Sequence, residues 1–499
     1  MSSRDLLRDP CWQGSDLGHP LPDATHAVSV ALPRWRDVIA YEENQPACRG
    51  ALRAVYPRFG LHPLVAQLSG IALQASDSFV PQASSSWPYS SRAAAEAALR
   101  HCRRKNPDGQ LQILTIHGLS CLITDATSSP CAKAFWQHTG LGASSRLAAI
   151  ALGQENAISP EDGESARRNV IQRLAQIYGC APDDISLHPS GMTALHRALE
   201  LVSVLKPGRP VLQIGFPYVD VLKLPEVVFN GAELLLDDHP DQVGAALKRL
   251  QPAAVVVELP SNPLLRCVNL TTIAQVAHDH GIPVIADDTI GSGLNIDALP
   301  HADLVFSSLT KSFAGRGDVL AGSLVLSHHS RWYETFTASA NSRPPLAELA
   351  GVDAIALDQG SRDVTERVPL LNANALTLAE HLRLHPAVAH VFHPGDCQRF
   401  QSLQRPGGGH GCLLSFVLKG GTDQARQVYD ALTVCKGPSL GTSFTLVCPY
   451  VLLAHYEELP WAEGCGVPSH LLRVSVGLED SDELWHRFEQ ALADSRPSQ

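Results

Sequence analysis

Short apolar runs alternate with amphipathic stretches between about residues 92 and 330. Each run is followed at once by small or polar residues. Between the runs, apolar residues recur at helical spacing, for example from Val170 to Tyr178. This alternation predicts a mostly parallel α/β sheet, in which ligands bind at the carboxyl ends of the strands. The expected strands are 111–116, 210–214, 253–257, 283–286 and 303–306.

The pattern changes after about residue 340. A long helical stretch over 346–384 precedes two expected strands, 412–417 and 472–476. Asp480 then begins a final helix with a pattern that resembles a capping box. These elements predict a smaller α+β domain at the C-terminal end.

The first 91 residues are rich in proline and polar residues, and they end in a serine-rich stretch, 84–91, typical of a linker. We predict that this segment is an extended arm that lies against a neighbouring subunit. The expected division is therefore an arm over 1–91, an α/β domain over 92–340 and an α+β domain over 341–499.

Composition narrows the class of protein. Hydrophobic residues make up 44% of the chain and charged residues 18%, which is typical of a globular protein. The net charge of −11 is unfavourable for a nucleic-acid partner, and no apolar run is long enough to span a membrane. The N-terminus lacks the apolar stretch of a secretory signal, and the 12 cysteines form no C-x-x-C pair. We expect a cytoplasmic protein with reduced thiols and no metal site.

Lys311 closes the apolar run 303–306 through the sequence Ser-Ser-Leu-Thr-Lys. A lysine at the end of a buried strand is partly removed from water and is suited to imine formation. The hydroxyls of Ser308 and Thr310 are placed to bind a phosphate beside it. Taken alone, the same pattern also fits an ordinary surface lysine.

Asp287 follows the apolar run 283–286. A carboxylate buried at this depth needs a cationic partner, and a protonated pyridine nitrogen is one such partner. An acid that caps a loop is the alternative for Asp287 in isolation. Because Asp287 and Lys311 are separated by one strand-to-strand crossover, both are expected to end adjacent strands at the same edge.

Two further strand ends carry polar residues. Ser190-Gly-Met-Thr193 precedes a helix, and backbone N–H groups at a helix N-terminus favour a phosphate. Asn262, in Glu258-Leu-Pro-Ser-Asn-Pro263, is placed to bond a ring hydroxyl. A plain helix cap and an Asn-Pro turn are the corresponding alternatives.

With these residues taken together, the chain resembles the γ-family of pyridoxal-phosphate (PLP) enzymes of cysteine and methionine metabolism, and within it the fungal cystathionine γ-synthase branch. The resemblance covers about residues 26–492. The segments that carry it are His26–Pro33, Tyr56–Phe59, Ser190–Met192, Gly215–Tyr218, Pro260–Leu265, Ser308–Lys311, Lys436–Thr442 and Arg473–Asp480.

The resemblance implies a fold-type I PLP transferase and a role for each matching residue. Lys311 would hold the cofactor as a Schiff base and shuttle protons, and Tyr218 would stack on the ring and join Lys311 in catalysis. Arg473, helped by Ser439, would bind the substrate carboxylate. The remaining cofactor-binding residues would be Tyr56, Arg58, Gly191, Met192, Asn262, Asp287, Ser308 and Thr310.

Tyr56 and Arg58 match a Tyr-x-Arg motif that reaches the phosphate of the neighbouring subunit. The resemblance therefore implies a homodimer or homotetramer with shared active sites. The chain also departs from the family pattern. Residues 312–317 read Ser-Phe-Ala-Gly-Arg-Gly, His410 replaces a tyrosine found in many relatives, and Phe216-Pro-Tyr218 replaces a bacterial Tyr-Gly-Gly.

The activity implied is γ-replacement on an O-acylated homoserine, with cysteine as nucleophile and cystathionine as product, as in transsulfuration and methionine biosynthesis. Three alternatives stay open at this point. The nucleophile is a carbon or an amine in a specialised pathway; the enzyme is a lyase; or the chain is a PLP-free scaffold. A scaffold has no physical need for all of Lys311, Asp287, Tyr218, Arg58 and Arg473.

Overall fold

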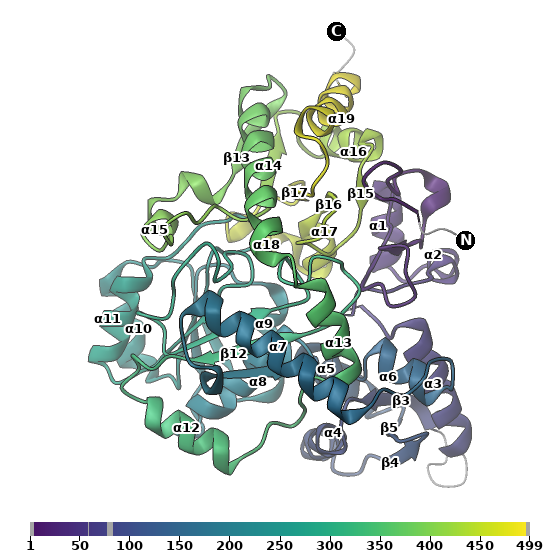
Figure 1. Ribbon diagram of the computed structural model, residues 1–499, viewed down its shortest axis with the longest axis vertical. Helices are drawn as coiled ribbons and strands as arrows, with labels where there is room; N and C mark the ends of the chain where they lie inside the picture. The colour runs from purple at the N-terminus through teal and green to yellow at the C-terminus, as the bar shows by residue number, and fades with distance from the viewer. Residues whose placement is uncertain (1–3, 58, 77–82, 496–499) are drawn as a thin grey trace.

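A computed structural model of the protein describes residues 4–57, 59–76 and 83–495 (Figure 1). Its secondary structure forms a central sheet covered by helices, a smaller C-terminal sheet and a separate three-stranded sheet near the N-terminus. Within the described residues, no helix is long and apolar enough to cross a membrane. All twelve cysteines lie in the described part of the chain, and none of them forms a disulfide.

The central sheet has the strand order β6-β12-β11-β10-β9-β7-β8. Neighbouring strands from β11 to β8 are parallel, whereas β12 is antiparallel to both β11 and β6. The predicted mostly parallel sheet is therefore confirmed. The strands are β6 (Ile185–His188), β7 (Val211–Ile214), β8 (Ala232–Leu235), β9 (Val255–Glu258), β10 (Val284–Asp287), β11 (Leu304–Ser308) and β12 (Gly322–Leu326).

Both faces of this sheet are buried, which is why its strands read as continuous apolar runs. Val255 and Val257 of β9 pack in one core, and Val256 between them packs in another core on the opposite face. The first core includes residues of α7, α10 and α11, and the second includes residues of α8 and α12. The helices around the sheet are α7 (Pro160–Tyr178), α8 (Gly191–Val202), α9 (Val219–Val228), α10 (Pro240–Leu250), α11 (Leu270–Asp279), α12 (Tyr333–Ser342) and α13 (Gly351–Gly360).

The serine-rich stretch that was expected to be a linker is instead a strand, and this prediction was wrong. β3 (Ala83–Tyr89) pairs with β5 (Leu119–Asp125), which also pairs with β4 (Leu111–Ile116), and all pairings are antiparallel. The hydroxyl of Ser85 bonds those of Thr124 and Ser129, so the polar side chains satisfy one another within the fold. Residues 111–116 therefore form a strand as predicted, but outside the parallel sheet.

Helices pack around this small antiparallel sheet and give it apolar clusters of its own. Trp87, Tyr89 and Phe135 are among the buried residues. The neighbouring helices are α3 (Pro63–Ser76), α4 (Arg92–Lys105), α5 (Ser129–Thr139) and α6 (Ser145–Ala151). The first part of the chain is therefore more than an extended arm.

The C-terminal sheet has the order β13-β14-β17-β16-β15. The helix expected over 346–384 is divided into α13 and α14. α13 ends at Gly360, where an added Cβ would lie 2.9 Å from the Ala314 carbonyl oxygen. Asp480 caps α19 by accepting two backbone N–H bonds, as predicted. The elements are α14 (Val364–Leu384), β13 (Val388–Phe392), α15 (Gln398–Gln401), β14 (Leu413–Leu418), α16 (Gly421–Ala431), β15 (Cys435–Lys436), β16 (Leu446–Pro449), α17 (Tyr450–Ala454), α18 (Leu459–Gly464), β17 (Leu472–Ser475) and α19 (Ser481–Asp494).

Residues 4–51 lie against this C-terminal part of the same chain (Figure 1). The Leu32 amide donates to the Lys436 carbonyl at 2.9 Å, and the Tyr429 hydroxyl donates to the Leu32 carbonyl at 2.6 Å. The elements here are β1 (Pro20–Leu21), β2 (Ser29–Val30), α1 (Trp35–Glu42) and α2 (Pro46–Ala51). The division of the chain at residues 91 and 340 stays a prediction.

Candidate active site

The carboxyl ends of β9, β10 and β11 lie side by side at one edge of the central sheet. Asp287, the last residue of β10, is aligned with Glu258 on β9 and with Phe306 on β11. Lys311 follows soon after the end of β11. All four residues line one cavity, as the order of the strand ends predicts.

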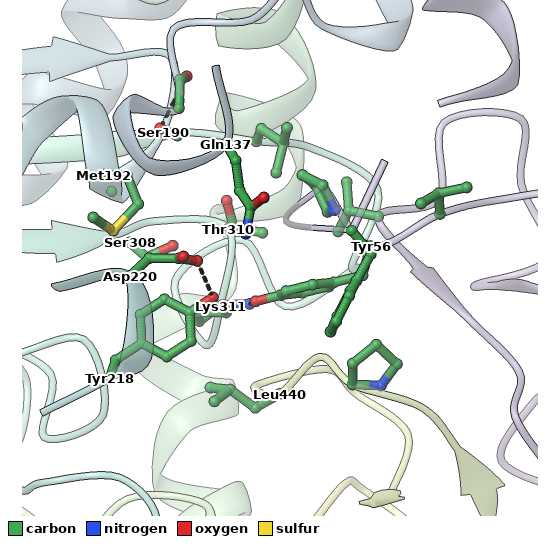
Figure 2. Close-up of a pocket in the computed structure, with 18 of the residues that line it drawn as sticks. Tyr56, Gln137, Ser190, Met192, Tyr218, Asp220, Ser308, Thr310, Lys311 and Leu440 are labelled. Carbon is green, nitrogen blue, oxygen red and sulfur yellow. Dashed lines mark hydrogen bonds between the residues drawn. The ribbon is translucent and has the colours of Figure 1, made fainter. Parts of the chain in front are cut away.

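Lys311 lies in this cavity with a side chain that is almost fully buried. Its Nζ donates to the Tyr56 hydroxyl at 3.0 Å and to the Ser439 hydroxyl at 3.3 Å. Within the described part of the chain, no carboxylate forms an ion pair with it. The amine is therefore held by two neutral hydroxyls, and Figure 2 shows the Tyr56 oxygen pointing at it.

Tyr56 responds to this contact. Burial alone raises the pKa of a phenol, but the charge of Lys311 and its hydrogen bond outweigh burial and lower the pKa of Tyr56 below its usual range. Tyr56 is also hydrogen-bonded to the side chain of Tyr218. The two tyrosines and the lysine thus form one hydrogen-bonded group.

Asp287 is buried, and burial raises its pKa to about 6. Its Oδ1 accepts the backbone N–H of Thr289 at 2.9 Å. The neighbouring Asp288 does not line the cavity. It accepts the Tyr178 hydroxyl at 2.8 Å, and burial raises its pKa to about 7. Of the two acids, Asp287 is therefore the one placed to meet a cation in the cavity.

The N-terminus of α8 opens onto the same cavity. Ser190 caps the helix by accepting the Thr193 N–H at 3.1 Å, and Gly191 and Met192 form the first turn. A Cβ added to Gly191 would lie 2.8 Å from the Cβ of Ser308. Glycine is required there because the helix start and β11 approach too closely for any side chain.

Ser308 and Thr310 both line the cavity. Thr310 accepts the Ala321 N–H at 3.0 Å and donates to the Ala321 carbonyl at 3.4 Å, so its hydroxyl already has backbone partners. Ser308 donates its backbone N–H to Thr289 at 2.8 Å. Thr310 is thus tied to the backbone of the turn after Lys311.

Glu258 is a structural member of the site to which the sequence assigned no role. Its Oε2 accepts the backbone N–H groups of Tyr218 at 2.9 Å and Asn262 at 3.1 Å. Burial and the nearby Asp287 raise the pKa of Glu258 well above its usual range. One acid at a strand end therefore fixes two loops of the cavity. The sequence signal that could have identified Glu258 is a charged residue at the end of a buried strand.

Asn262 is buried at the same edge of the sheet. Its Oδ1 has no hydrogen-bond partner among the described residues. A buried polar atom without a partner is costly, so its presence in a cavity lining points to a ligand.

Arg473 reaches the cavity from β17 in the C-terminal sheet and is 3% exposed. Its guanidinium donates to the carbonyls of Pro438 at 2.7 Å and Ser439 at 3.0 Å, and lies 4.9 Å from the ring centre of Tyr450. A guanidinium fixed in this way, close to the Ser439 partner of Lys311, suits a carboxylate ligand.

A second hydrogen-bonded chain starts at Tyr218 and was not found from the sequence. The Tyr218 hydroxyl donates to Asp220 Oδ2 at 2.9 Å (Figure 2). The other carboxylate oxygen of Asp220 lies 3.0 Å from Nδ1 of His138 on α5. No sequence signal could join His138 to Asp220, because the contact depends on how α5 packs against α9.

Within this chain the Tyr56 hydroxyl contacts Lys311. The expected reach of Tyr56 into a neighbouring subunit's site stays a prediction. The first part of the chain packs against its own C-terminal part, which brings Tyr56 to this position. Arg58, the other residue of the motif, lies outside the described residues.

Comparison with known proteins gives a consistent result. Residues 162–493 match the model of the "Cys/Met metabolism PLP-dependent enzyme" family. The chain is 29% identical to a cystathionine gamma-synthase of Neurospora crassa, over 96% of this chain and 98% of the relative. It is 32% identical to an L-2-amino-4-chloropent-4-enoate dechlorinase/desaturase of Streptantibioticus cattleyicolor, over 95% and 97%.

Solved structures agree. The crystal structure of cystathionine gamma synthase from Xanthomonas oryzae pv. oryzae in complex with cystathionine superposes with a TM-score of 0.59 at 26% identity. The similarity covers 69% of this chain and 89% of that one. The fold is therefore fold type I, as expected.

Replacing Asp287 by asparagine tests the electrostatics of the cavity. The pKa of the Asp287 carboxyl is 3.8 in the unfolded chain and about 6 in the folded protein. Its contribution to stability is therefore fully present below pH 3.8, where the acid is protonated in both states, and is lost as the pH rises through about 6. Compared with wild type, cofactor-free Asp287→Asn protein should therefore gain stability between pH 4.5 and 7. The gain should be on the order of 2–3 kcal/mol by urea unfolding.

The PLP-loaded protein is the control, because a pyridinium opposite Asp287 reverses the sign and makes the asparagine variant the less stable one. A constant difference across this pH range in the cofactor-free proteins would show that Asp287 is not the titrating group.

Mixed subunits test where Tyr56 acts. Because Tyr56 contacts Lys311 of its own chain, a hybrid of Tyr56→Ala and Lys311→Ala subunits contains no intact site. We expect turnover in such hybrids, isolated with two affinity tags, to stay at the level of the Tyr56→Ala protein. Recovery of about half the wild-type rate per hybrid dimer would instead mean that Tyr56 serves the neighbouring site.

Proposed function

Because the chain belongs to the Cys/Met metabolism PLP-dependent enzyme family, we propose that it catalyses γ-replacement on an O-acylated homoserine with L-cysteine, giving cystathionine. The observation that carries the proposal is that Lys311 and Arg473 meet at Ser439. Lys311 donates to the Ser439 hydroxyl, and Arg473 donates to its carbonyl. A proton-transferring amine and a carboxylate-binding cation are thus both bonded to one residue of the cavity wall.

The residues of the cavity fit the cofactor of the family. The unpartnered Oδ1 of Asn262 suits a ring hydroxyl, Asp287 suits the pyridine nitrogen, and the close approach at Gly191 leaves backbone N–H groups facing a phosphate. Pyridoxal phosphate, when bound, supplies an electron sink that makes the protons on the substrate α- and β-carbons acidic. The proposed cofactor-binding residues are Tyr56, Arg58, Gly191, Met192, Tyr218, Asn262, Asp287, Ser308, Thr310 and Lys311.

Lys311 is proposed to carry the proton transfers. Its amine takes the α-proton and then a β-proton, and it returns one proton to each carbon after the γ-substituent has been replaced; Tyr218 assists it through Tyr56. The γ C–O bond breaks with its electron pair on the departing carboxylate, and the cysteine sulfur forms the new bond at the γ-carbon. The thiol proton balances the carboxylate that leaves.

Arg473 is proposed to fix the substrate. Its two carbonyl partners hold one guanidinium nitrogen, Nη2, in place, and Ser439 adds a hydroxyl beside it. A planar fork orients a carboxylate better than a point charge can, so the α-carbon would be held near Lys311.

A different reaction on the same site is the second candidate. The Streptantibioticus cattleyicolor relative has the higher identity to this chain, 32% against 29% for the Neurospora crassa relative, and is named as a dechlorinase/desaturase. This supports a specialised enzyme with a carbon or amine nucleophile, or a γ-lyase. We further propose a cytoplasmic homodimer or homotetramer, acting in methionine biosynthesis if cysteine is the nucleophile.

A product assay decides between the candidates. PLP-loaded protein is incubated with O-acetylhomoserine and an equimolar mixture of cysteine, a primary amine and a carbon acid, and the products are identified by mass. We expect cystathionine to dominate, with Lys311→Ala protein giving none. An amine or carbon adduct would establish the specialised reaction, and 2-oxobutanoate with ammonia as sole products would establish a lyase.

Arg473→Lys tests the carboxylate site. Loss of the bidentate fork should raise the KM for the amino-acid substrate about 10- to 100-fold, from roughly 1.5–3 kcal/mol of charged hydrogen bonding. kcat should change much less. Arg197→Lys is the matched control, because Arg197 is also buried against backbone carbonyls but lies outside the cavity. Equal effects of both variants on KM would contradict this role.

A further inference from the structure

Asp220 lines the cavity and His138 contacts it from outside the lining, and neither is among the residues that the family resemblance supplies. Asp220 is 2% exposed and lies in the first turn of α9, two residues after Tyr218. His138 lies in the last turn of α5, and its side chain is 13% exposed. The two helices pack against each other, and the contact between His138 and Asp220 joins them.

The two oxygens of Asp220 have separate partners. Oδ2 accepts the Tyr218 hydroxyl at 2.9 Å, and Oδ1 lies 3.0 Å from His138 Nδ1. A carboxylate held from both sides cannot rotate away, so the Tyr218 proton has a fixed acceptor. The Tyr218 oxygen is then left to accept from its other neighbour, Tyr56.

The chain of donors continues to the reactive amine. Lys311 donates to Tyr56 at 3.0 Å, Tyr56 is bonded to Tyr218, and Tyr218 donates to Asp220. Figure 2 shows the two tyrosine hydroxyls converging on Lys311, with Asp220 joined to the Tyr218 hydroxyl by a dashed line. Because the single Tyr218 proton is donated to Asp220, the Tyr218 oxygen can only accept in its bond with Tyr56, which orders the links from the lysine towards the carboxylate.

We propose that Asp220 and His138 are positioning residues that fix the direction of a proton relay from Lys311 through Tyr56 and Tyr218. Asp220 holds Tyr218 as a donor, and His138 holds Asp220 in the orientation that this requires. The relay lets Lys311 give up and regain a proton without solvent entering the cavity. It serves α-proton transfer, so it holds for any nucleophile.

A purely structural reading is the competing explanation. An acid in the first turn of a helix and a histidine in the last turn of another both favour the helix dipoles, by about 0.3–1 kcal/mol each. Under that explanation, changing Asp220 or His138 has no effect on the Tyr56 hydroxyl, because Tyr56 belongs to neither helix. The state of the Tyr56 hydroxyl therefore separates the two explanations.

The first measurement uses cofactor-free protein. The nine tyrosines are replaced by 3-fluorotyrosine, and the ¹⁹F resonances of residues 56 and 218 are assigned with single Tyr→Phe variants. Asp220→Asn should move both resonances by more than their linewidths, because the amide cannot act as the same charged acceptor. If the Tyr56 resonance does not move in the Asp220→Asn variant, the proposed relay is wrong, whichever reaction the enzyme catalyses.

The second measurement uses PLP-loaded protein and exchange of the α-proton of L-norvaline into D₂O, which involves neither a leaving group nor a nucleophile. His138→Leu should slow the exchange at saturation about 10- to 100-fold, with little change in half-saturation. His138→Asn should restore most of the rate, because its amide N–H occupies the place of Nδ1–H. Equal loss in both variants would mean that His138 only fills space.

The chain offers a matched control. His278 on α11 bonds buried Asp303 at 2.9 Å in a second histidine–aspartate pair outside the cavity. His278→Leu should leave both fluorine resonances and the exchange rate unchanged. An equal slowing by His278→Leu and His138→Leu would assign the effect to general stability and overturn the proposal.

Discussion

The parallel pairing of β9, β10 and β11 is the constraint on which the rest of the site depends. It places Glu258, Asp287 and the turn that leads to Lys311 at one edge of the sheet. Each of these groups is then used differently. Glu258 binds two loop amides, Asp287 faces the cavity and Lys311 turns towards hydroxyls from the N-terminal and C-terminal parts of the chain. A shift of one residue in this register would turn all of them to the wrong face.

Burial of several acids at this edge has an electrostatic cost. The pKa values of Glu258, Asp287 and Asp288 are all raised, in each case chiefly by burial. Backbone N–H groups and the Tyr178 hydroxyl offset part of this cost. A cation bound against Asp287 would offset more of this cost.

The central sheet was predictable because its signal is local. A run such as Val255–Val257 is apolar throughout, which only a strand buried on both faces requires. The residues after each strand were predictable for the same reason, since strand direction alone determines where they lie. The fold class and the group around Lys311 and Asp287 could thus be predicted without coordinates.

The rest depends on packing between distant segments. Residues 84–91 look like a linker because serines are common in loops, and only the cross-strand bonds of Ser85 explain them as a strand. His138 gives no sign of Asp220, which lies on another helix, and Tyr56 is brought to Lys311 by the N-terminal segment folding back. Glu258 was visible but ambiguous, because an acid at a strand end fits a cap equally well.

The cavity draws on both ends of the chain, with Tyr56 near the beginning and Arg473 near the end facing Lys311 between them. Contacts between residues so far apart in sequence form late, because a long loop must close before they are made. A central sheet that has folded before these contacts form therefore carries an unfinished cavity. Lys311 is enclosed only when β17 packs beside it, so the local order of the strand ends does not by itself complete the site.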